Sequence, residues 1–367
     1  MIEIMTIVGA RPQFVKAAVF SRRVRMTPYA GEIHETIVHT GQHYDDNMSD
    51  IFFREMDIPE PEFNLGIGSG SHGAMTGAML AGIEELLLNH KPDVVLVYGD
   101  TNSTLAGALA AAKLHIPVAH VEAGLRSFMM MMPEEQNRRL TDHLSTWLFC
   151  PTQAAVSNLE HEGIQCRVPV KPSSDEKVVV NCGDIMLEAS LYYRARLVDT
   201  PLKNIPKKFY LLTLHRAENT DDPARLSAII QALNQYTDIE VVFPIHPRTR
   251  KIITNMGLSF ASHIHMIEPV GYLEMLALEN ACSFVVTDSG GVQKEAYFFK
   301  KPCITLRDST EWVELVEHGW NILVGADSKK INAALCSMPK YGDSSELYGN
   351  GQTSKTIADY LLGVNTL

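Results

Sequence analysis

Short apolar runs alternate with helix-like stretches along most of the chain. Thr101–Lys113 is rich in alanine and leucine, and Pro133–Ser145 carries a stripe formed by Leu140 and Leu144. Strands that alternate with helices favour βαβ units and a parallel sheet. The first half therefore predicts one doubly wound α/β domain, with strands at Glu3–Val8, Glu35–His39, Val94–Tyr98, Val118–Val121 and Trp147–Cys150.

A second set of apolar runs follows a stretch rich in proline, serine and lysine. That stretch, between Arg167 and Val180, is interpreted as a connection. The expected fold class is α/β, with two Rossmann-like doubly wound domains, residues 1–170 and 171–367, facing a central cleft. Lys355–Leu362 predicts a final helix, for which packing back on the first domain is one option. The second set of predicted strands comprises Phe209–Thr213, Glu240–Pro244, Ile264–Ile267, Phe284–Thr287 and Cys303–Leu306.

Length and charge support this division and exclude some partners. The 367 residues exceed the roughly 250–300 residues at which a single core stops growing. The 32 Lys and Arg residues against 43 Asp and Glu residues give a net charge of −11, which argues against nucleic acid or an anionic membrane as a partner. No apolar run reaches the roughly 18–20 residues of a membrane span. The chain opens directly as a strand, without a cationic leader.

Cysteine and histidine spacing does not indicate a metal site. The six cysteines are widely spaced and form no CxxC pair, which favours reduced thiols in a cytoplasmic protein. His39 and His43, followed by Asp45 and Asp46, superficially resemble metal ligands, but their spacing matches no standard site. We expect no bound metal.

The end of the first strand is a candidate anion site. Ligands of doubly wound sheets bind beyond the carboxyl ends of the strands. Here Gly9 allows a close turn, and the helix that follows offers N–H groups together with the charges of Arg11 and Lys16. The alternative is a plain connection with solvated basic residues. The segment is neither a Walker loop nor GxGxxG, so it specifies no nucleotide.

Three carboxylates follow other strands of the first half. Asp100 and Glu122 come directly after predicted strands, and Glu134 opens a helix four residues before Arg138. Each has a structural alternative: a helix cap, an ion pair with Arg126, or compensation of the helix dipole. If the three converge, their pKa values spread apart, and the cluster then supplies both an acid and a base.

Histidines follow two strands of the second half. His215 comes directly after a strand and is the best candidate for proton transfer or phosphate contact, against the alternative of a structural histidine. His246 follows the next strand and has a weaker claim.

A small-residue turn leads from another apolar strand into a helix. The backbone N–H groups of Ser289, Gly290 and Gly291 could hold a diphosphate without a lysine. Glu295, one turn later, could accept hydrogen bonds from ribose hydroxyls. The alternative is a tight turn selected for packing.

Taken in order, these segments resemble the non-hydrolysing UDP-N-acetylglucosamine 2-epimerase family. The resemblance covers most of the chain and implies a GT-B-like fold with an active site between two Rossmann-like halves. It also implies a cytoplasmic homodimer that supplies ManNAc-type sugar nucleotides for surface polysaccharides. The matching segments are GARPQFVK, GQHYD, YGDTNSTLAGA, HVEAGLRS, MPEEQNRRLTDH, CGD, LHRAEN, TDSGGVQKEA and LRDSTEW.

The chemistry implied by the resemblance is C2 epimerisation of a UDP-N-acetylhexosamine. The proton at C2 is removed and UDP leaves C1, which gives a bound 2-acetamidoglucal. UDP then adds back while C2 is protonated from the other face. The family needs no cofactor, in agreement with the missing dinucleotide fingerprint. The resemblance implies a catalytic set of Asp100, Glu122, Glu134, His215 and Lys16, and a substrate-binding set of Arg11, Arg138, His246, Ser289, Gly290, Gly291, Glu295 and Arg307.

Several positions depart from the family pattern and leave alternatives open. Trp312 stands where the TERPE segment of the family has arginine, and Asp45 replaces the second glutamine of a pair linked to allosteric activation. GARPQF and TEWVE resemble the branch that includes UDP-2,3-diacetamido-2,3-dideoxyglucuronate 2-epimerases. Met129–Met131 replace polar residues of a loop. The alternatives are an epimerase for that uronate, a catalytically weak UDP-sugar-binding homologue, or a glycosyltransferase of similar architecture.

Overall fold

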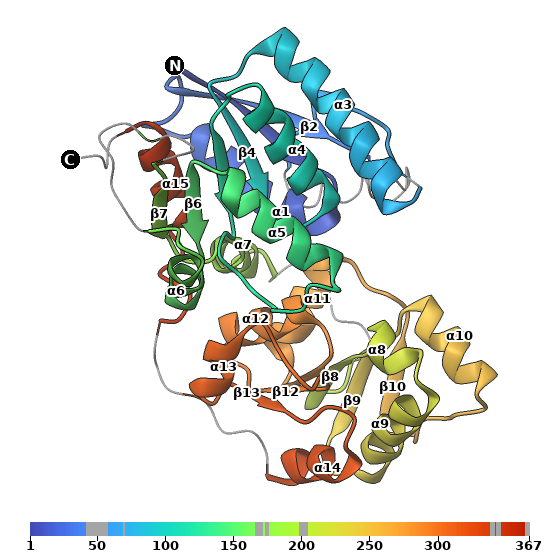
Figure 1. Cartoon of the computed structure of the whole chain (residues 1–367). Helices are drawn as coiled ribbons and strands as arrows, with labels where there is room; N and C mark the ends of the chain where they lie inside the picture. Colours follow the sequence, from blue (N-terminus) through green and yellow to red (C-terminus); the bar gives the residue numbers. More distant parts are fainter. Residues whose placement is uncertain are drawn as a thin grey trace. The chain divides into compact units, whose positions relative to one another are not determined.

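The computed structural model divides into two compact units (Figure 1). One comprises Met1–Ala189 with Tyr348–Leu367, and the other comprises Ser190–Leu347. The residues that the structure describes are 1–41, 58–68, 70–165, 172, 176–197, 205–337, 342 and 346–363.

The described residues of the first unit form a seven-stranded parallel sheet. Its strand order is β3-β2-β1-β4-β5-β6-β7, so the order reverses beside β1, as it does in doubly wound folds. The strands are β1 (Ile2–Val8), β2 (Ile33–His39), β3 (Phe63–Asn64), β4 (Val94–Tyr98), β5 (Val118–Val121), β6 (Trp147–Cys150) and β7 (Val178–Asn181).

The second unit repeats this topology. Its described residues form a six-stranded parallel sheet of order β10-β9-β8-β11-β12-β13, which again reverses beside its first strand. The strands are β8 (Phe209–Thr213), β9 (Glu240–Pro244), β10 (Ile264–Ile267), β11 (Val285–Thr287), β12 (Cys303–Thr305) and β13 (Asn321–Leu323).

Helices follow the strands in both units (Figure 1). In the first unit they are α1 (Arg11–Val24), α3 (His72–His90), α4 (Asn102–Lys113), α5 (Pro133–Leu144), α6 (Gln153–His161) and α15 (Thr353–Leu361). α7 (Ile185–Arg194) contributes residues to both units. In the second unit they are α8 (Ala217–Thr220), α9 (Pro223–Gln235), α10 (Pro247–Asn255), α11 (Tyr272–Ala281), α12 (Gly290–Phe298), α13 (Val313–Glu317) and α14 (Ser328–Ser337). Within the described parts of the chain, no helix combines the length and the hydropathy that a membrane crossing requires.

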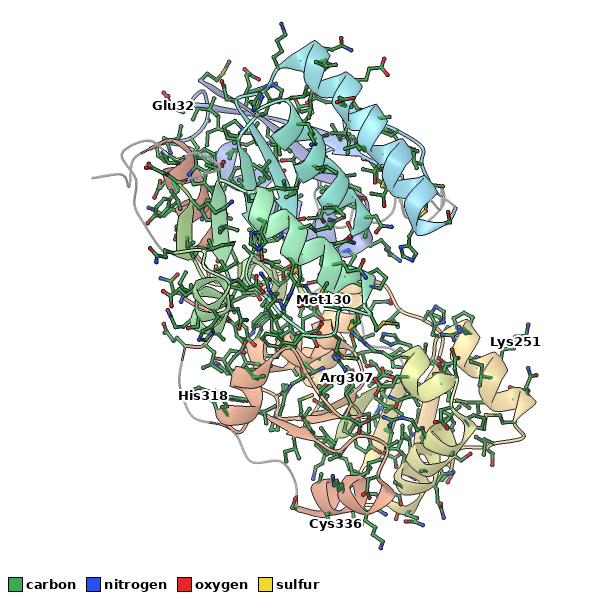
Figure 2. All side chains as sticks on the ribbon, in the orientation of Figure 1. Glu32, Met130, Lys251, Arg307, His318 and Cys336 are labelled. Atoms are coloured by element: carbon green, nitrogen blue, oxygen red, sulfur yellow. The ribbon has the colours of Figure 1, made fainter. Side chains whose placement is uncertain are left out.

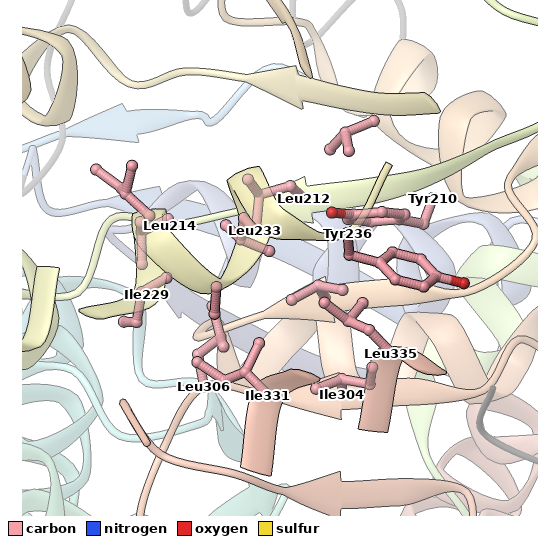
Figure 3. Packing of buried hydrophobic residues seen from close by; sticks show 14 of the residues in the cluster. Tyr210, Leu212, Leu214, Ile229, Leu233, Tyr236, Ile304, Leu306, Ile331 and Leu335 are labelled. Carbon is pink, nitrogen blue, oxygen red and sulfur yellow. The ribbon is translucent and has the colours of Figure 1, made fainter. Parts of the chain in front are cut away.

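Continuous apolar strands place each sheet inside its unit. Every residue of β4, with the sequence VVLVY, is buried, as expected for a parallel sheet covered on both faces. In the second unit, the rings of Tyr210 and Phe284 stack with their centroids 4.9 Å apart. Leu233 of α9 and Ile331 of α14 belong to the same apolar cluster (Figure 3).

The ten predicted strands are all present, and three strands were missed. Two of these, β3 and β13, are too short for an alternating or apolar pattern to stand out. The third, β7, pairs in parallel with β6. The interpretation of the whole stretch between Arg167 and Val180 as a connection was therefore wrong, because its last residues are a strand of the first sheet.

The division into units differs from the predicted boundary between residues 170 and 171. The first unit continues through β7 to Ala189, and the chain returns to it at Tyr348. The final helix α15 lies against α1, where the Tyr29 hydroxyl donates to Asp359 at 2.6 Å and Arg23 Nε donates to Ser354 at 3.1 Å. The last part of the chain thus stabilises the unit in which the chain begins.

The returning segment makes one glycine sensitive to substitution. Gly183 has φ +80°, and a Cβ atom there would lie 2.7 Å from the Tyr348 carbonyl oxygen. Gly163 has φ +83°, but a Cβ atom there would meet nothing within 4 Å. We expect Gly163→Ala to lose about 1 kcal/mol of unfolding free energy through backbone strain alone. Gly183→Ala should lose at least about 2 kcal/mol, because the Tyr348 backbone must also shift.

Urea unfolding of the two alanine variants and the wild type measures this difference. Equal losses in the two variants would show that the contact between Gly183 and the returning segment does not stabilise the first unit.

Candidate active site

Charged side chains gather at the carboxyl ends of the strands of the first sheet. Lys16, on α1, forms an ion pair with Glu122, which directly follows β5. Both side chains are largely buried, at 12% and 7% exposure. Glu122 has φ +69°, a strained conformation for a residue other than glycine and one that is found most often at functional sites.

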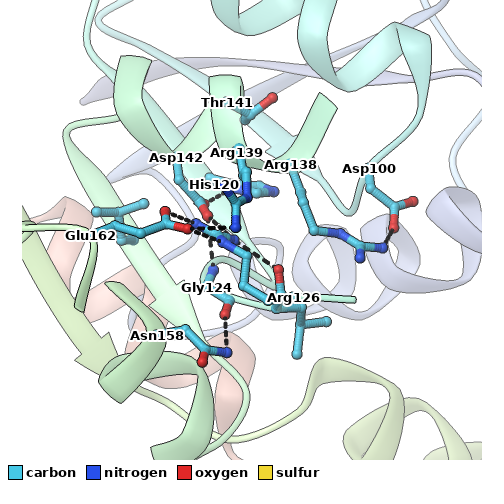
Figure 4. A network of polar contacts seen from close by, with 12 residues as sticks. Asp100, His120, Gly124, Arg126, Arg138, Arg139, Thr141, Asp142, Asn158 and Glu162 are labelled. Carbon is cyan, nitrogen blue, oxygen red and sulfur yellow. Dashed lines mark hydrogen bonds and ion pairs between the residues drawn. The ribbon is translucent and has the colours of Figure 1, made fainter. Parts of the chain in front are cut away.

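A second carboxylate lies at the end of β4 and is also paired. Asp100 forms an ion pair with Arg138 of α5, as Figure 4 shows. Burial by itself lowers the pKa of the Arg138 guanidinium, but the Asp100 and Glu135 carboxylates outweigh burial and raise it. Two of the predicted catalytic carboxylates, Asp100 and Glu122, are thus each held by a cation at adjacent strand ends.

The third predicted carboxylate, Glu134, lies in the first turn of α5, four residues before Arg138. Glu134 is exposed, and Arg138 instead bonds to Glu135 at 3.0 Å. The Glu135 carboxylate also accepts hydrogen bonds from the Ser127 N–H at 2.8 Å and from Arg139 at 3.0 Å. Glu134 and Arg138 are four residues apart on α5, but the inward-facing Glu135 is the carboxylate that pairs with Arg138.

The hydrogen bonds of Glu135 change its ionisation. Burial tends to raise the pKa of Glu135, but the bonds from Ser127 and the charges of Arg138 and Arg139 lower it below its ordinary value. Glu135 is therefore ionised and structural. A catalytic role for the exposed Glu134 stays a prediction.

The turn that leads into α1 is hydrogen-bonded by a side chain of the helix itself. The Gln13 side-chain oxygen accepts the N–H groups of Gly9 and Ala10 at 2.8 and 2.9 Å. Its amide nitrogen donates to the Tyr98 carbonyl at 2.7 Å and so joins the ends of β1 and β4. Gln13 thus satisfies the two N–H groups that precede α1, and anion binding by the N–H groups of the helix itself stays a prediction. Arg11, at the start of α1, has an exposed side chain.

The Met129–Met132 loop carries exposed apolar side chains in place of polar ones. Met129 and Met130 are about half exposed, and Met131 is almost fully exposed (Figure 2). The Gln136 side chain donates to the Met130 carbonyl at 2.9 Å, and the Met132 carbonyl accepts the N–H groups of Glu135 and Gln136. The loop therefore supplies no charge to the carboxylate cluster.

In the second unit, Asp288 organises the end of β8. Its carboxylate accepts the N–H groups of His215 and Arg216 at 3.0–3.2 Å and the Asn219 side chain at 3.2 Å. The His215 ring remains half exposed. Partial burial lowers its pKa, with Arg216 and His246 adding to this effect and Asp288 opposing it. His215 is therefore a neutral imidazole near pH 7 and can accept a proton or a hydrogen bond.

The predicted small-residue turn forms the start of α12. Ser289 is the N-cap, and Gly290 and Gly291 are the first residues of the helix. A Cβ atom on Gly290 would lie 2.4 Å from a Glu311 carboxylate oxygen, so the Glu311 side chain would have to shift to admit any larger residue. The Trp312 indole N–H donates to the Gly290 carbonyl at 2.9 Å, and this hydrogen bond stabilises the turn at the start of α12.

Trp312 also contacts a lysine. The Lys294 ammonium lies 4.2 Å from the centre of the indole ring, within the range of a cation–π interaction. Trp312, which departs from the family pattern, therefore contacts both the Ser289–Gly291 turn and Lys294 in α12.

Glu295 lies one turn further into α12, beside a second buried carboxyl. Glu279 of α11 is fully buried. Burial and the nearby charge of Glu295 raise the pKa of Glu279 well above its ordinary value. Glu279 is therefore protonated and places no second negative charge beside Glu295.

The two remaining predicted contacts, Arg307 and His246, have partners within the second unit. Arg307 is largely buried (Figure 2) and bonds to Glu311 at 2.8 Å. His246 caps α10 and accepts the Arg248 N–H at 3.2 Å. Substrate binding by either side chain stays a prediction.

Candidate metal ligands are not grouped in the described parts of the chain. No set of three or more His, Cys, Asp or Glu side chains there is arranged to hold a metal ion. His43, Asp45 and Asp46, and with them the position linked to allosteric activation, lie outside the described residues. Five cysteines are free thiols, among them the exposed Cys336.

Two Rossmann-like sheets with charged strand ends and a glycine-rich helix start define an α/β protein of the nucleotide-binding class. The family described as UDP-N-acetylglucosamine 2-epimerase matches residues 28–362. The UDP-2,3-diacetamido-2,3-dideoxy-D-glucuronate 2-epimerase of Pseudomonas aeruginosa is 53% identical over 363 residues, which cover 98% of this chain and 99% of the relative.

Solved structures agree with the family match. Methanocaldococcus jannaschii UDP-GlcNAc 2-epimerase, in complex with UDP-GlcNAc and UDP, is 44% identical with a TM-score of 0.83, covering 98% of this chain and 99% of that one. The Neisseria meningitidis enzyme bound to UDP-GlcNAc is 32% identical with a TM-score of 0.84, covering 98% and 100%. The chain belongs to the UDP-N-acetylglucosamine 2-epimerase family, and its fold is GT-B-like.

The different surroundings of Glu134 and Glu135 predict different effects on stability. Glu135→Gln places an amide NH₂ among the donors of Ser127, Arg138 and Arg139, and should cost about 1–3 kcal/mol. Glu134→Gln, at an exposed position, should change stability by less than about 0.5 kcal/mol. Because the pKa of Glu135 is lowered in the folded state, its contribution is present above the ordinary pKa of 4.5 and is lost as the pH falls below it.

Thermal and urea unfolding between pH 3 and 8 measure both variants. A Glu135→Gln variant as stable as Glu134→Gln at neutral pH, or a stability gap that does not narrow in acid, would contradict this assignment.

Proposed function

We propose that the protein epimerises a UDP-N-acetylhexosamine at C2 by eliminating UDP and adding it back. One observation carries the proposal: two carboxylates, Asp100 and Glu122, each held by a cation, stand at the ends of adjacent strands. The membership in the 2-epimerase family supports the same reaction.

The reaction needs a positioned base, because a proton on carbon is a poor acid. In the proposed path, one carboxylate removes the C2 proton while the C1–O bond breaks and its electrons leave with UDP. A C1=C2 double bond forms, which gives the bound 2-acetamidoglucal. UDP then adds back to C1 while C2 receives a proton on the opposite face. Asp100, Glu122 and Glu134 are the groups proposed for these two proton transfers.

Lys16 and Arg138 have positioning roles in this proposal. Their ion pairs hold the Glu122 and Asp100 carboxylates at the strand ends, and a misplaced base loses much of its rate advantage. Arg11 is proposed as a further cation for the substrate.

The second unit is proposed to hold the nucleotide. The N-terminus of α12, with Ser289, Gly290 and Gly291, offers backbone N–H groups to the diphosphate. Glu295, beside the protonated Glu279, would accept hydrogen bonds from the ribose hydroxyls. The neutral His215 would contact the phosphate or the leaving group, with His246 and Arg307 as further contacts.

The sugar itself has two candidates. The Pseudomonas aeruginosa relative, at 53% identity, is named for UDP-2,3-diacetamido-2,3-dideoxy-D-glucuronate, and GARPQF and TEWVE resemble the same branch. These two observations favour the uronate over UDP-GlcNAc as the preferred substrate. A cytoplasmic homodimer that supplies precursors of surface polysaccharides belongs to this proposal, supported by the family resemblance.

Exchange of the C2 proton with solvent tests the reaction. In D₂O with UDP-GlcNAc or the uronate, we expect deuterium at C2 and both epimers in the NMR spectrum. Asp100→Asn, Glu122→Gln and Glu134→Gln should each lower turnover by about 10²-fold or more while UDP still binds. Glu160→Gln, at an exposed position on α6, is the matched control and should retain turnover.

The outcomes separate the alternatives. Binding without exchange would favour a silent UDP-sugar-binding homologue, and transfer of the sugar to an acceptor would favour a glycosyltransferase. Wild-type rates in all three carboxylate variants would refute the assignment of the bases.

Comparison of the two sugars tests the substrate preference. A site built for a uronate carboxylate leaves a cation unpaired when that carboxylate is missing, so kcat/KM for the uronate should exceed that for UDP-GlcNAc by about tenfold or more. Steady-state rates for both sugars, measured in both directions, provide the ratio. A ratio near one, or a preference for UDP-GlcNAc, would remove the uronate as the preferred substrate.

A further inference from the structure

A buried carboxylate outside the proposed catalytic set connects the turns that carry Asp100 and Glu122. Asp142 lies on α5, and its side chain is fully buried. One of its oxygens lies 2.7 Å from His120 Nδ1. The other accepts the Gly124 N–H at 3.1 Å and Arg126 Nη1 at 2.7 Å (Figure 4). The carboxylate thus contacts three donors from β5 and the loop after it.

His120 extends this contact to the neighbouring strand. Its ring is fully buried on β5, and its Nε2 lies 2.7 Å from the carbonyl oxygen of Gly99. Gly99 is the residue directly before Asp100. A carbonyl oxygen and an ionised carboxylate only accept hydrogen bonds, so each ring nitrogen donates to its own partner. Nδ1 then faces the Asp142 carboxylate, and the ring bridges α5 and the turn that carries Asp100.

The ionisation of Asp142 fits this arrangement. Burial by itself raises the pKa of Asp142, but the hydrogen bond and charge of His120 and the charge of Arg126 outweigh burial and lower it. An ionised carboxylate can accept from all its donors at once, which a neutral amide of the same shape cannot do.

The contacts of Asp142 therefore extend to the turn that carries Asp100 and to the turn that carries Glu122. Gly99 immediately precedes Asp100, and Gly124 is two residues beyond Glu122. The same helix, α5, carries Arg138, which pairs with Asp100. One side chain thus links the helix that holds the cation to both of the turns that hold the carboxylates.

We propose that Asp142, acting through His120 and Gly124, is a positioning residue that keeps the Asp100 and Glu122 turns in register for proton transfer. This inference rests on the proposed function. It predicts a loss of kcat with an unchanged KM for the UDP-sugar, because Asp142 acts on the placement of the bases and touches no substrate group.

Asp142→Asn is the main test. The amide keeps the shape of the carboxylate but turns an NH₂ group toward a donor. We expect kcat for C2 epimerisation to fall by about tenfold or more, since small displacements of reacting groups cost that much. KM should stay within about twofold, with rates measured well below the unfolding temperature. An unchanged kcat, or a rise in KM that accounts for the whole loss, would overturn the inference.

Glu162→Gln is the matched control within the same network. Glu162 accepts hydrogen bonds of 2.9 and 2.6 Å from Arg126 and lies 3.3 Å from Arg139, and among the described residues its side chain bonds to neither Gly99 nor Gly124. Its loss removes a charge and an ion pair from the network while the contacts of Asp142 remain. We expect kcat within about twofold of the wild type. A loss as large as that of Asp142→Asn would show that the network acts only through stability.

If Asp142→Asn does not fold, His120→Gln provides a second test of the same inference. A glutamine amide can donate to the Gly99 carbonyl or to Asp142, but it cannot bridge both as the ring does, while Arg126 and Gly124 still bond to Asp142. The same fall in kcat at constant KM is expected, and wild-type kcat in His120→Gln would overturn the bridge.

A double-mutant cycle separates positioning from general damage. If Asp142 acts through the two bases, Asp142→Asn should lower the residual rate of Asp100→Asn by much less than it lowers the wild-type rate. Losses that multiply in full would overturn the inference. A wild type without C2 exchange would overturn the proposed function and this inference with it, whereas an active wild type with an equally active Asp142→Asn would overturn the inference alone.

Discussion

The pairing of buried carboxylates with positive charge is the interaction on which the first unit depends. Glu122, Asp100 and Asp142 lie at strand ends or on α5, and each contacts a lysine or an arginine. A buried charge without a partner costs several kcal/mol, whereas a paired one is tolerated. This constraint decides which side chains of α5 turn inward: the buried positions Glu135, Arg138 and Asp142 are three and four residues apart and lie on one face of the helix.

The second unit also stabilises its buried carboxyl groups, in one case with backbone N–H donors and in another by protonation. Asp288 accepts N–H groups of the turn after β8, while Glu279 avoids an unpaired charge because burial raises its pKa. The two units therefore share a topology but differ in the electrostatics at their strand ends. Carboxylates paired with cations suit proton transfer in the first unit, and the backbone N–H groups at the start of α12 suit a diphosphate in the second.

Long apolar runs made most of the sheets predictable. A strand such as β4 is buried on both faces, so its sequence is continuously hydrophobic and needs no tertiary information to be found. The strand β7 was missed although Val178–Val180 is apolar, because the proline and serine residues before it resembled a linker. Which unit this strand joins depends on its pairing with β6, a contact between segments far apart in the sequence.

The sequence by itself determined that charged and small residues follow the strands, and hence that Asp100, Glu122, His215 and the Ser289–Gly291 turn occupy the functional edges of two sheets. It also carried the motifs of the family. Only the tertiary structure decided that Glu135 and not Glu134 pairs with Arg138, that Gln13 binds the two N–H groups before α1, and that Asp142 joins two turns. The physical reason is that strand ends follow from local periodicity, whereas the partner of a buried charge depends on helix rotation and on residues distant in the chain.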